Sequence, residues 1–373
     1  MRSLYEQVYQ SLKQDIGSDK YQAGDRLPSE KEVSESFQVS RITSKKALEK
    51  LAAEGFVYRQ RGKGTFVAED KKMNRQAKAS NKKPLFGLVV TNFDDSFTSH
   101  LISSIEEASS NQCFIILKRS LGDPKREETI VKELLDFGVD GLIIFPAQAE
   151  HYSSEILKMV VNQFPFILID RCFKSVAATS ISTKNEEAAK LGINYLFELG
   201  HDHIGILSPY MIETTTIEAR FNGIIEAYAE KQVRIDRDLW CSDIRSTAPI
   251  PQADIEEDIE VIKQHIQKNP HISALFAFEY NIAVLAKRAA EQLDLRVPND
   301  LSILCFDGPE YNVLGWNFTR LKQNEQEIGK LAVNTLMDMC RHEPFTVRNE
   351  RISATLIEGD STSRLVMKEH PVQ

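Results

Sequence analysis

The amino-acid sequence predicts a small α+β head of helices and a β-hairpin, followed by an α/β body with two doubly wound parallel sheets around a ligand cleft. Three observations lead to this prediction. The chain has 373 residues, too many for one hydrophobic core of ordinary size. Residues 1–83 carry 18 Lys and Arg against 11 Asp and Glu, whereas the remainder carries 28 against 43. From Leu85 onward, short apolar runs alternate with helical patterns.

The composition narrows the class of protein. No apolar run approaches the roughly 20 residues that a membrane span needs, and the N-terminal residues lack the apolar stretch of a secretion signal. The five cysteines lie far apart without a C-x-x-C pair, which favours reduced thiols over a disulfide set or a metal site. We therefore expect a cytoplasmic protein with no membrane partner, no metal and no cofactor.

The division of charge indicates a partner for the head. A basic segment of net charge +7 in front of a body of net charge −15 is typical of a protein that meets a polyanion at one end. Cations between residues 71 and 83 supply much of the excess, so a merely solvated charged segment is the alternative.

The first helix and the hairpin bound the head. Apolar residues recur at i, i+4 and i+8 from Leu4, which predicts an amphipathic helix over 3–15. Further on, two short β-type runs, 56–59 and 65–67, flank the glycine-rich tip RGKG at 61–64. The head therefore ends in a hairpin with a flexible, positively charged tip.

Capping signals define the other two helices of the head. Ser29 stands three residues before Glu32, the spacing of a capping box, so we expect a helix over 29–37. Ser40 is suited to cap a third helix, which ends near Gly55.

These elements together form a winged helix-turn-helix. Arg41 and Lys45 lie one turn apart near the start of the third helix. The major groove of DNA admits a helix whose first residues meet base edges, and glycine at the wing tip lets backbone N–H groups approach phosphate oxygens. The sequence therefore predicts double-stranded DNA as a partner of the head.

Over residues 1–70 the head resembles the GntR-type DNA-binding domain. The matching stretches are GDRLPSE (24–30), VSR (39–41), Ala47-Leu48, Leu51, Gly55 and GKGTFV (62–67). By position the resemblance implies that Arg41 reads a base, that Lys31 contacts a phosphate and that Lys45 makes a second contact. Arginine is frequent at that second position, so Lys45 leaves its bidentate geometry open. The expected DNA-binding residues are Lys31, Ser40, Arg41, Thr43, Lys45, Lys46, Arg61, Gly62, Lys63 and Gly64.

The body reads as alternating strands and helices. The expected strands are 86–90, 114–118, 141–145, 166–170, 203–207, 274–278 and 302–306. Amphipathic segments such as 186–199 lie between several of them. Continuous apolar strands separated by helices indicate parallel sheets buried on both faces, with ligands bound at the carboxyl ends of the strands.

Polar residues follow several of these strands. The runs are TNFDD (91–95), Asp170-Arg171, Glu279-Tyr280 and Asp307-Gly308. Carboxylates, an arginine and an amide near aromatic rings suit a polyhydroxylated ligand, because hydroxyls need both donors and acceptors and sugar C–H faces pack on rings. Structural salt bridges between subdomains are the alternative use of these charges.

From residue 85 to about 360 the body resembles the effector domain of the LacI/GalR family, which is built like a periplasmic sugar-binding protein. The matching stretches are FPFILIDR (164–171), KNEEAAKLGINYLFELGHDHIGIL (184–207), ARFNGIIEA (219–227), SALFAFEYNIAVLA (273–286), VPNDLSILCFDG (297–308) and FTRLKQ (318–323). The resemblance implies effector contacts by Asp170, Arg220 of an R-x-x-G motif, Asp307 and Gln323, with Phe93 in the first ligand-lining loop. Together with the strand-end residues, the expected effector-binding set is Phe93, Asp170, Arg171, Arg220, Glu279, Asp307 and Gln323.

The body departs from the family pattern in two places. Glu279-Tyr280 replaces the usual Asn-Asp, and Lys184 replaces a usual acidic residue. A GntR-type head on such a body resembles the arabinose repressors of Gram-positive bacteria, which makes L-arabinose the best single expectation for the effector. A phosphorylated sugar or a nucleobase stays open.

The expected organisation is a DNA-binding domain over 1–70, a flexible basic linker over 71–84, and an effector-binding and dimerisation domain over 85–373. No G-x-S-x-G, P-loop or G-x-G-x-x-G motif appears, so we expect no enzyme. The sequence predicts a homodimeric, sugar-responsive transcriptional regulator, a repressor in preference to an activator. A solute-binding protein that does not bind DNA is the rival, and the basic head opposes it.

Overall fold

The protein folds into two compact units, Met1–Lys83 and Pro84–Gln373. The computed structural model describes residues 4–18, 20–22, 24–53, 56–60, 64–68, 83–148, 153–174, 176–210, 214–310, 315–341 and 346–365. The expected linker over 71–84 lies outside the described residues except for its last two positions.

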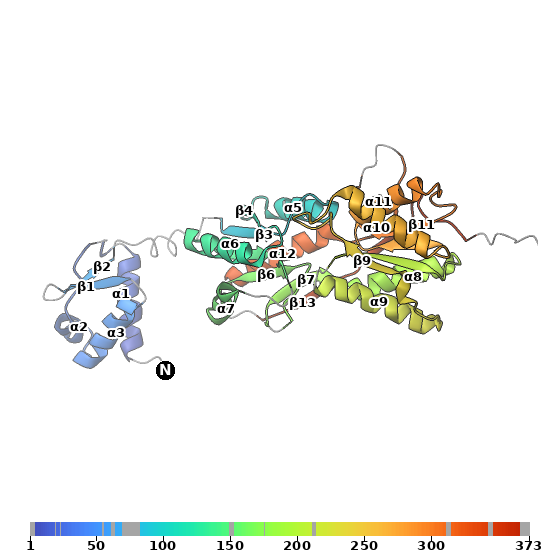
Figure 1. Ribbon diagram of the computed structural model, residues 1–373. Helices are drawn as coiled ribbons and strands as arrows, with labels where there is room; N and C mark the ends of the chain where they lie inside the picture. The colour runs from blue at the N-terminus through green and yellow to red at the C-terminus, as the bar shows by residue number, and fades with distance from the viewer. Residues whose placement is uncertain are drawn as a thin grey trace, which may run out of the picture. The chain divides into compact units, whose positions relative to one another are not determined.

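Over its described residues, the head contains three helices and a two-stranded antiparallel sheet (Figure 1). Their bounds are α1 Leu4–Gly17, α2 Glu30–Ser36, α3 Arg41–Ala53, β1 Val57–Gln60 and β2 Gly64–Val67. The three predicted helices and the hairpin are thus confirmed, although Gly55 and the wing tip 61–63 lie outside the described residues.

Capping fixes the starts of the second and third helices. The Ser29 hydroxyl accepts from the Glu32 N–H at 3.3 Å while the Glu32 carboxylate accepts from the Ser29 N–H at 2.7 Å, which confirms the capping box. The Ser40 hydroxyl accepts from the Thr43 N–H at 3.2 Å and so caps α3 as expected. Behind these caps, the buried core of the head consists of Val8, Tyr9, Leu12, Ile16, Leu27, Val33, Ala47, Leu48, Leu51, Val57 and Val67.

The body contains two six-stranded sheets with the orders β13-β7-β6-β5-β3-β4 and β14-β12-β11-β10-β8-β9. The strands of the first sheet are β3 Leu85–Val90, β4 Phe114–Arg119, β5 Gly141–Ile144, β6 Phe166–Ile169, β7 Thr179–Thr183 and β13 Asn349–Ile352. Those of the second are β8 Ile204–Pro209, β9 Trp240–Ile244, β10 Ala274–Ala277, β11 Ser302–Phe306, β12 Thr319–Lys322 and β14 Thr355–Ile357. All neighbouring strands are parallel except β12 and β14.

Helices bury both faces of each sheet, as the continuous apolar strands predict. The first sheet is covered by α5 Ser96–Ser109 and α12 Glu325–Arg341 on one face and by α6 Pro124–Phe137 and α7 Ser154–Val161 on the other. The second is covered by α8 Asn185–Glu198 and α9 Thr215–Lys231 on one face and by α10 Ile255–Lys268 and α11 Tyr280–Gln292 on the other. A short 3₁₀ helix, η1 Arg237–Leu239, precedes β9.

The two sheets repeat one topology. In each, the first strand of the subdomain lies between its second and third strands, so the chain reverses direction across the sheet beside the first strand. In doubly wound sheets, ligands bind at the carboxyl ends of the strands next to such a reversal. The repeat therefore supplies two binding edges, one from each subdomain.

The chain crosses between the subdomains three times. The crossings follow β7, β12 and β13, near residues 184, 324 and 354. Three short connections define a hinge, because each allows rotation while together they restrict the direction of movement.

Candidate functional sites

The exposed cations expected to meet DNA lie mainly on α3, with one lysine on the otherwise acidic α2. Arg41, Lys45 and Lys46 of α3 are exposed, as is Lys31 of α2. Lys31 and Lys45 each lie 3.9 Å from a glutamate one helical turn away, pairs that are worth little in water. A phosphate group can therefore displace these glutamates at small cost.

The other residues expected to contact DNA lie at the start of α3 and in the wing. The hydroxyls of Ser40 and Thr43 lie 2.8 Å apart at the start of α3. Gly64 opens β2 with φ of +126°, and a Cβ there would lie 2.8 Å from Nε of Arg26, so the base of the wing requires glycine. Arg61, Gly62 and Lys63 lie outside the described residues.

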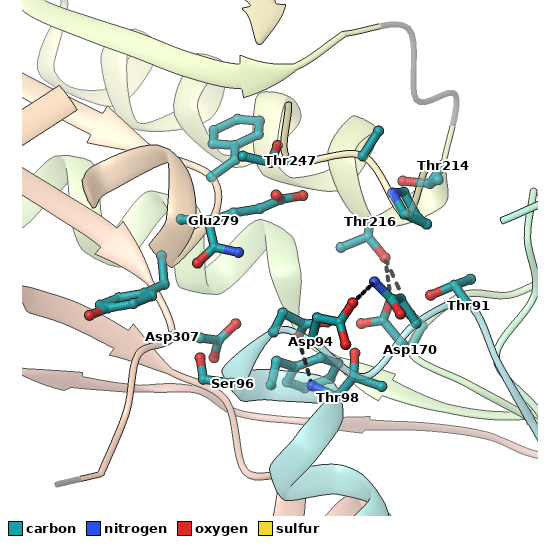
Figure 2. A pocket seen from close by; sticks show the side chains of 18 of the residues that line it. Thr91, Asp94, Ser96, Thr98, Asp170, Thr214, Thr216, Thr247, Glu279 and Asp307 are labelled. Carbon is teal, nitrogen blue, oxygen red and sulfur yellow. Dashed lines mark hydrogen bonds between the residues drawn. The ribbon is translucent and has the colours of Figure 1, made fainter. Parts of the chain in front are cut away.

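A cavity of about 280 Å³ lies between the two subdomains of the body, at the carboxyl ends of their strands (Figure 2). Six of the seven expected effector-binding residues line it: Asp170, Arg171, Arg220, Glu279, Asp307 and Gln323. Phe93 is not among the lining residues, although its neighbours Asn92 and Asp94 are. Its ring instead lies against the guanidinium of Arg119, 5.0 Å from centroid to Cζ.

Arg220 occupies the inner end of α9 and is 5% exposed. Its Nε donates to Oδ1 of Asn185 at 3.0 Å, its Nη1 donates to the carbonyl of Phe278, and its guanidinium stacks on the ring of Phe306 with Cζ 3.6 Å from the centroid. Arg220 thus ties α9 to the first crossing and to the ends of β10 and β11.

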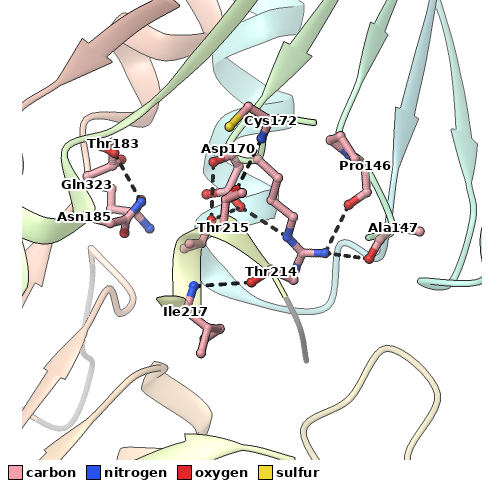
Figure 3. A network of polar contacts seen from close by, with 12 residues as sticks. Pro146, Ala147, Asp170, Cys172, Thr183, Asn185, Thr214, Thr215, Ile217 and Gln323 are labelled. Carbon is pink, nitrogen blue, oxygen red and sulfur yellow. Dashed lines mark hydrogen bonds and ion pairs between the residues drawn. The ribbon is translucent and has the colours of Figure 1, made fainter. Parts of the chain in front are cut away.

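Arg171 anchors the opposite wall of the cavity. Its Nη1 donates to the carbonyl oxygens of Pro146 and Ala147, at 3.0 Å each, and its Nε lies 3.6 Å from the carboxylate of Asp170 (Figure 3). The Thr216 hydroxyl reaches Asp170 from the second subdomain, 3.4 Å from Oδ2. Asp170 therefore receives contacts from both sides of the cleft.

Asp307 and Gln323 form a pair at the ends of β11 and β12. Oδ2 of Asp307 accepts from the Gln323 amide nitrogen Nε2 at 2.7 Å, and Oδ1 accepts from the Gln323 backbone N–H at 3.2 Å. The amide oxygen of Gln323 has no hydrogen-bond partner, although the residue is 1% exposed. A buried acceptor without a donor is costly, so this oxygen is poised to accept from a ligand.

The charges of the cavity are strongly perturbed. Burial raises the pKa of Glu279 and of Asp307 to about 7, against an opposing effect of Arg220. Burial likewise raises the pKa of Asp170, which Arg171 and Arg220 partly offset. Carboxyl groups that change charge near neutral pH can serve as donors or as acceptors toward hydroxyl groups.

Sequence reasoning missed several lining residues. Thr216 reaches the cavity from the start of α9, and Ser246 follows β9 with a buried hydroxyl that has no partner. Asn185, at the start of α8, does not line the cavity but accepts a hydrogen bond from Arg220, which does. The run Thr214-Thr215-Thr216 before the R-x-x-G motif was a usable signal, because Thr214 caps α9. No sequence pattern marks Ser246, because the preceding strand β9 mixes polar and apolar residues and is therefore not recognisable as a strand.

Two kinds of site are absent from the described part of the chain. No group of three or more His, Cys, Asp or Glu side chains there has the arrangement to hold a metal ion. No helix there is long and apolar enough to cross a membrane.

Comparison with known families agrees with both units. Residues 4–67 match the model for bacterial regulatory proteins of the gntR family, and residues 193–362 match the model for a periplasmic binding protein-like domain. The fold and sites therefore define a DNA-binding transcriptional regulator with a ligand-binding body.

Curated relatives are transcriptional repressors rather than enzymes. The chain is 25% identical over 347 residues to an arabinose metabolism transcriptional repressor of Geobacillus stearothermophilus, covering 90% of each chain. It is 25% identical over 277 residues to a ribose operon repressor of Haemophilus influenzae, covering 74% of this chain and 80% of the relative. The chain thus joins a head that matches the gntR family model to a body that matches the periplasmic binding protein-like model, and the relatives that it resembles over both units are transcriptional repressors.

Solved structures show the same fold. A LacI family regulator of Enterococcus faecium, crystallised with bound ribose, matches with a TM-score of 0.64 and 20% identity, covering 76% of this chain and all of the other. The lac repressor dimer bound to operator matches with a TM-score of 0.63 and 18% identity, covering 79% and 99%. At these identities the likeness concerns the fold alone.

Proposed function

We propose that this protein is a homodimeric, cytoplasmic repressor that a small sugar releases from its operator. One observation carries the proposal: partnerless acceptors and perturbed carboxyl groups converge on the cavity of a body joined to a DNA-binding head. Hydroxyl groups of a sugar would satisfy both kinds of group, donating to Gln323 and exchanging donor and acceptor roles with Glu279 and Asp307.

An uncharged sugar fits better than a phosphorylated one. Five carboxyl groups line the cavity, Asp94, Asp95, Asp170, Glu279 and Asp307, against two arginines. Both arginines already donate to protein oxygens. A phosphate would therefore meet an excess of like charge, although Nε of Arg171 is a buried donor without a hydrogen-bond partner.

L-arabinose is the first candidate for the effector. The relative with matching coverage over both units bears the name of arabinose metabolism, while a second relative bears that of ribose. Ribose is therefore the next sugar to test, and a nucleobase is the alternative outside this class. Glu279, at the end of β10, is the residue that we expect to distinguish them, because it is a departure from the family pattern.

Two heads on one dimer would bind a pseudo-palindromic operator, since dimer symmetry mirrors half-site symmetry. Sugar binding would close the subdomains about the three crossings, and operator and sugar would weaken each other's binding by the same factor. Such reciprocal couplings are typically about 1–3 kcal/mol.

Arg41→Ala tests the DNA-binding half of the proposal. We expect the variant to lose about 5- to 150-fold in affinity for operator DNA, because a bidentate base contact is worth about 1–3 kcal/mol. Lys20→Ala is the matched control, because Lys20 is an exposed head cation paired with Asp15 at 2.8 Å. Titration of a labelled operator measures both. Equal affinities for the two variants would remove Arg41 from the interface.

A further inference from the structure

The most exposed large apolar side chain described in the head lies on α3, the helix expected to enter the major groove. Ile42 is the second residue of α3 and is 70% exposed. It belongs to neither the buried core of the head nor the partly buried residues packed against that core. An isoleucine so far from the core contributes nothing to folding that a polar residue would not.

The geometry of α3 places Ile42 at the centre of its outer face. Ser44, Leu48 and Leu51 are fully buried and define the inner face. On a helix of 3.6 residues per turn, Ile42 lies nearly opposite them and between the exposed Lys45 and Lys46, three and four positions on.

The residues around Ile42 indicate which part of a DNA duplex would contact its side chain. Ser40, two residues before Ile42, caps the helix, so the first turn of α3 is fixed in position. The flanking cations suit phosphate groups, whereas an aliphatic side chain gains nothing from them. In the major groove, the apolar group offered by a base pair is the 5-methyl of thymine.

We propose that Ile42 reads the 5-methyl group of a thymine in each operator half-site. This inference rests on the proposed function and adds a specificity determinant to it. Lys45 and Lys46 would hold the helix against the backbone, while Ile42 would exclude water from one methyl group. Removing that contact should cost about 3- to 10-fold in affinity, the range for one buried methyl group or slightly more.

Uracil substitution tests the contact, because uracil lacks only the methyl group. The full-length chain first selects its operator from random duplexes, and each thymine of a half-site is then replaced by uracil. One replacement should weaken wild-type binding about 3- to 10-fold and leave Ile42→Ala binding unchanged. Leu4→Ala, which truncates an aliphatic side chain of α1 that is 61% exposed, should respond as wild type does.

The outcomes separate this inference from the proposed function. If a selected operator binds tightly but no uracil replacement distinguishes wild type from Ile42→Ala, the methyl contact is wrong and the regulator assignment stands. A selected half-site that contains no thymine would likewise show that the methyl contact is wrong, without affecting the regulator assignment. If no duplex is enriched over random sequence, the proposed function itself fails.

Discussion

Two aspartates show how single residues shape the cavity. Asp170 and Asp307 directly follow β6 and β11, the fourth strands of the two repeats, and have φ of +63° and +59°. Both backbone N–H groups donate to the neighbouring strand, to the carbonyls of Ile181 and Leu321. Left-handed backbone is unfavourable for most residues but tolerated by Asp and Asn. The repeat thus aims one carboxylate from each subdomain at the same space.

The pKa of Glu279 makes stability depend on pH. Its folded pKa of about 7 lies above the usual 4.5, so between these values the unfolded state releases a proton that the folded state retains. Stability from this group is therefore complete below about pH 4.5 and falls as the pH rises to about 7. Glu279→Gln should show a smaller loss of Tm between pH 5 and pH 8 than wild type, measured without sugar.

The remaining slope in that variant has named sources. Burial also raises the pKa of Asp307 and of Glu127 to about 7, and both are unchanged in Glu279→Gln, so a reduced slope is expected and not a flat profile. Parallel profiles for wild type and variant would show that Glu279 is ionised throughout this range.

Arg220 calls for a conservative test, because deleting it would leave buried carboxylates uncompensated at a cost of about 3–5 kcal/mol. Arg220→Lys keeps the positive charge but loses the fork that reaches Asn185 and Phe278. We expect sugar affinity to fall at least about 10-fold, by isothermal calorimetry, while operator affinity stays unchanged. If Arg220→Lys bound sugar as tightly as wild type, Arg220 would have a structural role only.

At the scale of elements, the R-x-x-G motif joins binding to packing. Arg220 faces the cavity, while Gly223 lies one turn later against the start of α8. A Cβ at Gly223 would lie 2.1 Å from the carbonyl oxygen of Glu186 and 3.1 Å from Cβ of Ala189. Glycine therefore lets α9 approach α8 closely enough for Arg220 to reach Asn185.

Gly223→Ala should push the two helices apart. We expect a loss of about 1–3 kcal/mol in the unfolding free energy of the body, the usual cost of overpacking, and weaker sugar binding. Urea unfolding followed by tryptophan fluorescence measures it, because Trp240 and Trp316 both lie in the body. A stability equal to wild type would show that α8 can move away freely.

The sequence predicts some elements better than others. Strands buried on both faces, such as β5 and β10, are continuous apolar runs and were all found. The missed strands β7, β9, β12, β13 and β14 carry polar residues, because they are edge strands or lie near the crossings. Periodicity cannot separate such short mixed runs from loops.

The site divides in the same way. Residues directly after apolar strands, such as Asp170 and Asp307, were predictable, since parallel strands bring their carboxyl ends together. Ser246 lines the cavity from the segment after β9, a polar edge strand that no local pattern marks. Phe93 was expected to line the cavity and does not, because a position after a strand does not by itself determine which way a side chain points.

At the scale of the whole molecule, two compact units should respond separately to their ligands. A sugar that binds only the body should raise the melting temperature of one unfolding transition and leave the other unchanged, because ligand stabilisation acts only on the unit that binds. Differential scanning calorimetry with and without roughly 10 mM L-arabinose measures the melting temperature of each transition. Equal shifts of both transitions, or no shift with any pentose or hexose, would oppose an effector site confined to the body.

Operator binding in the presence of sugar tests the central claim most directly. The full-length chain is titrated onto its selected operator at fixed salt, with and without each of a panel of pentoses, hexoses and their phosphates. We predict that one unphosphorylated sugar weakens operator affinity about 5- to 150-fold, the usual range of allosteric coupling, and that Arg220→Lys removes the effect. Operator affinity that stays constant with every sugar would contradict the account.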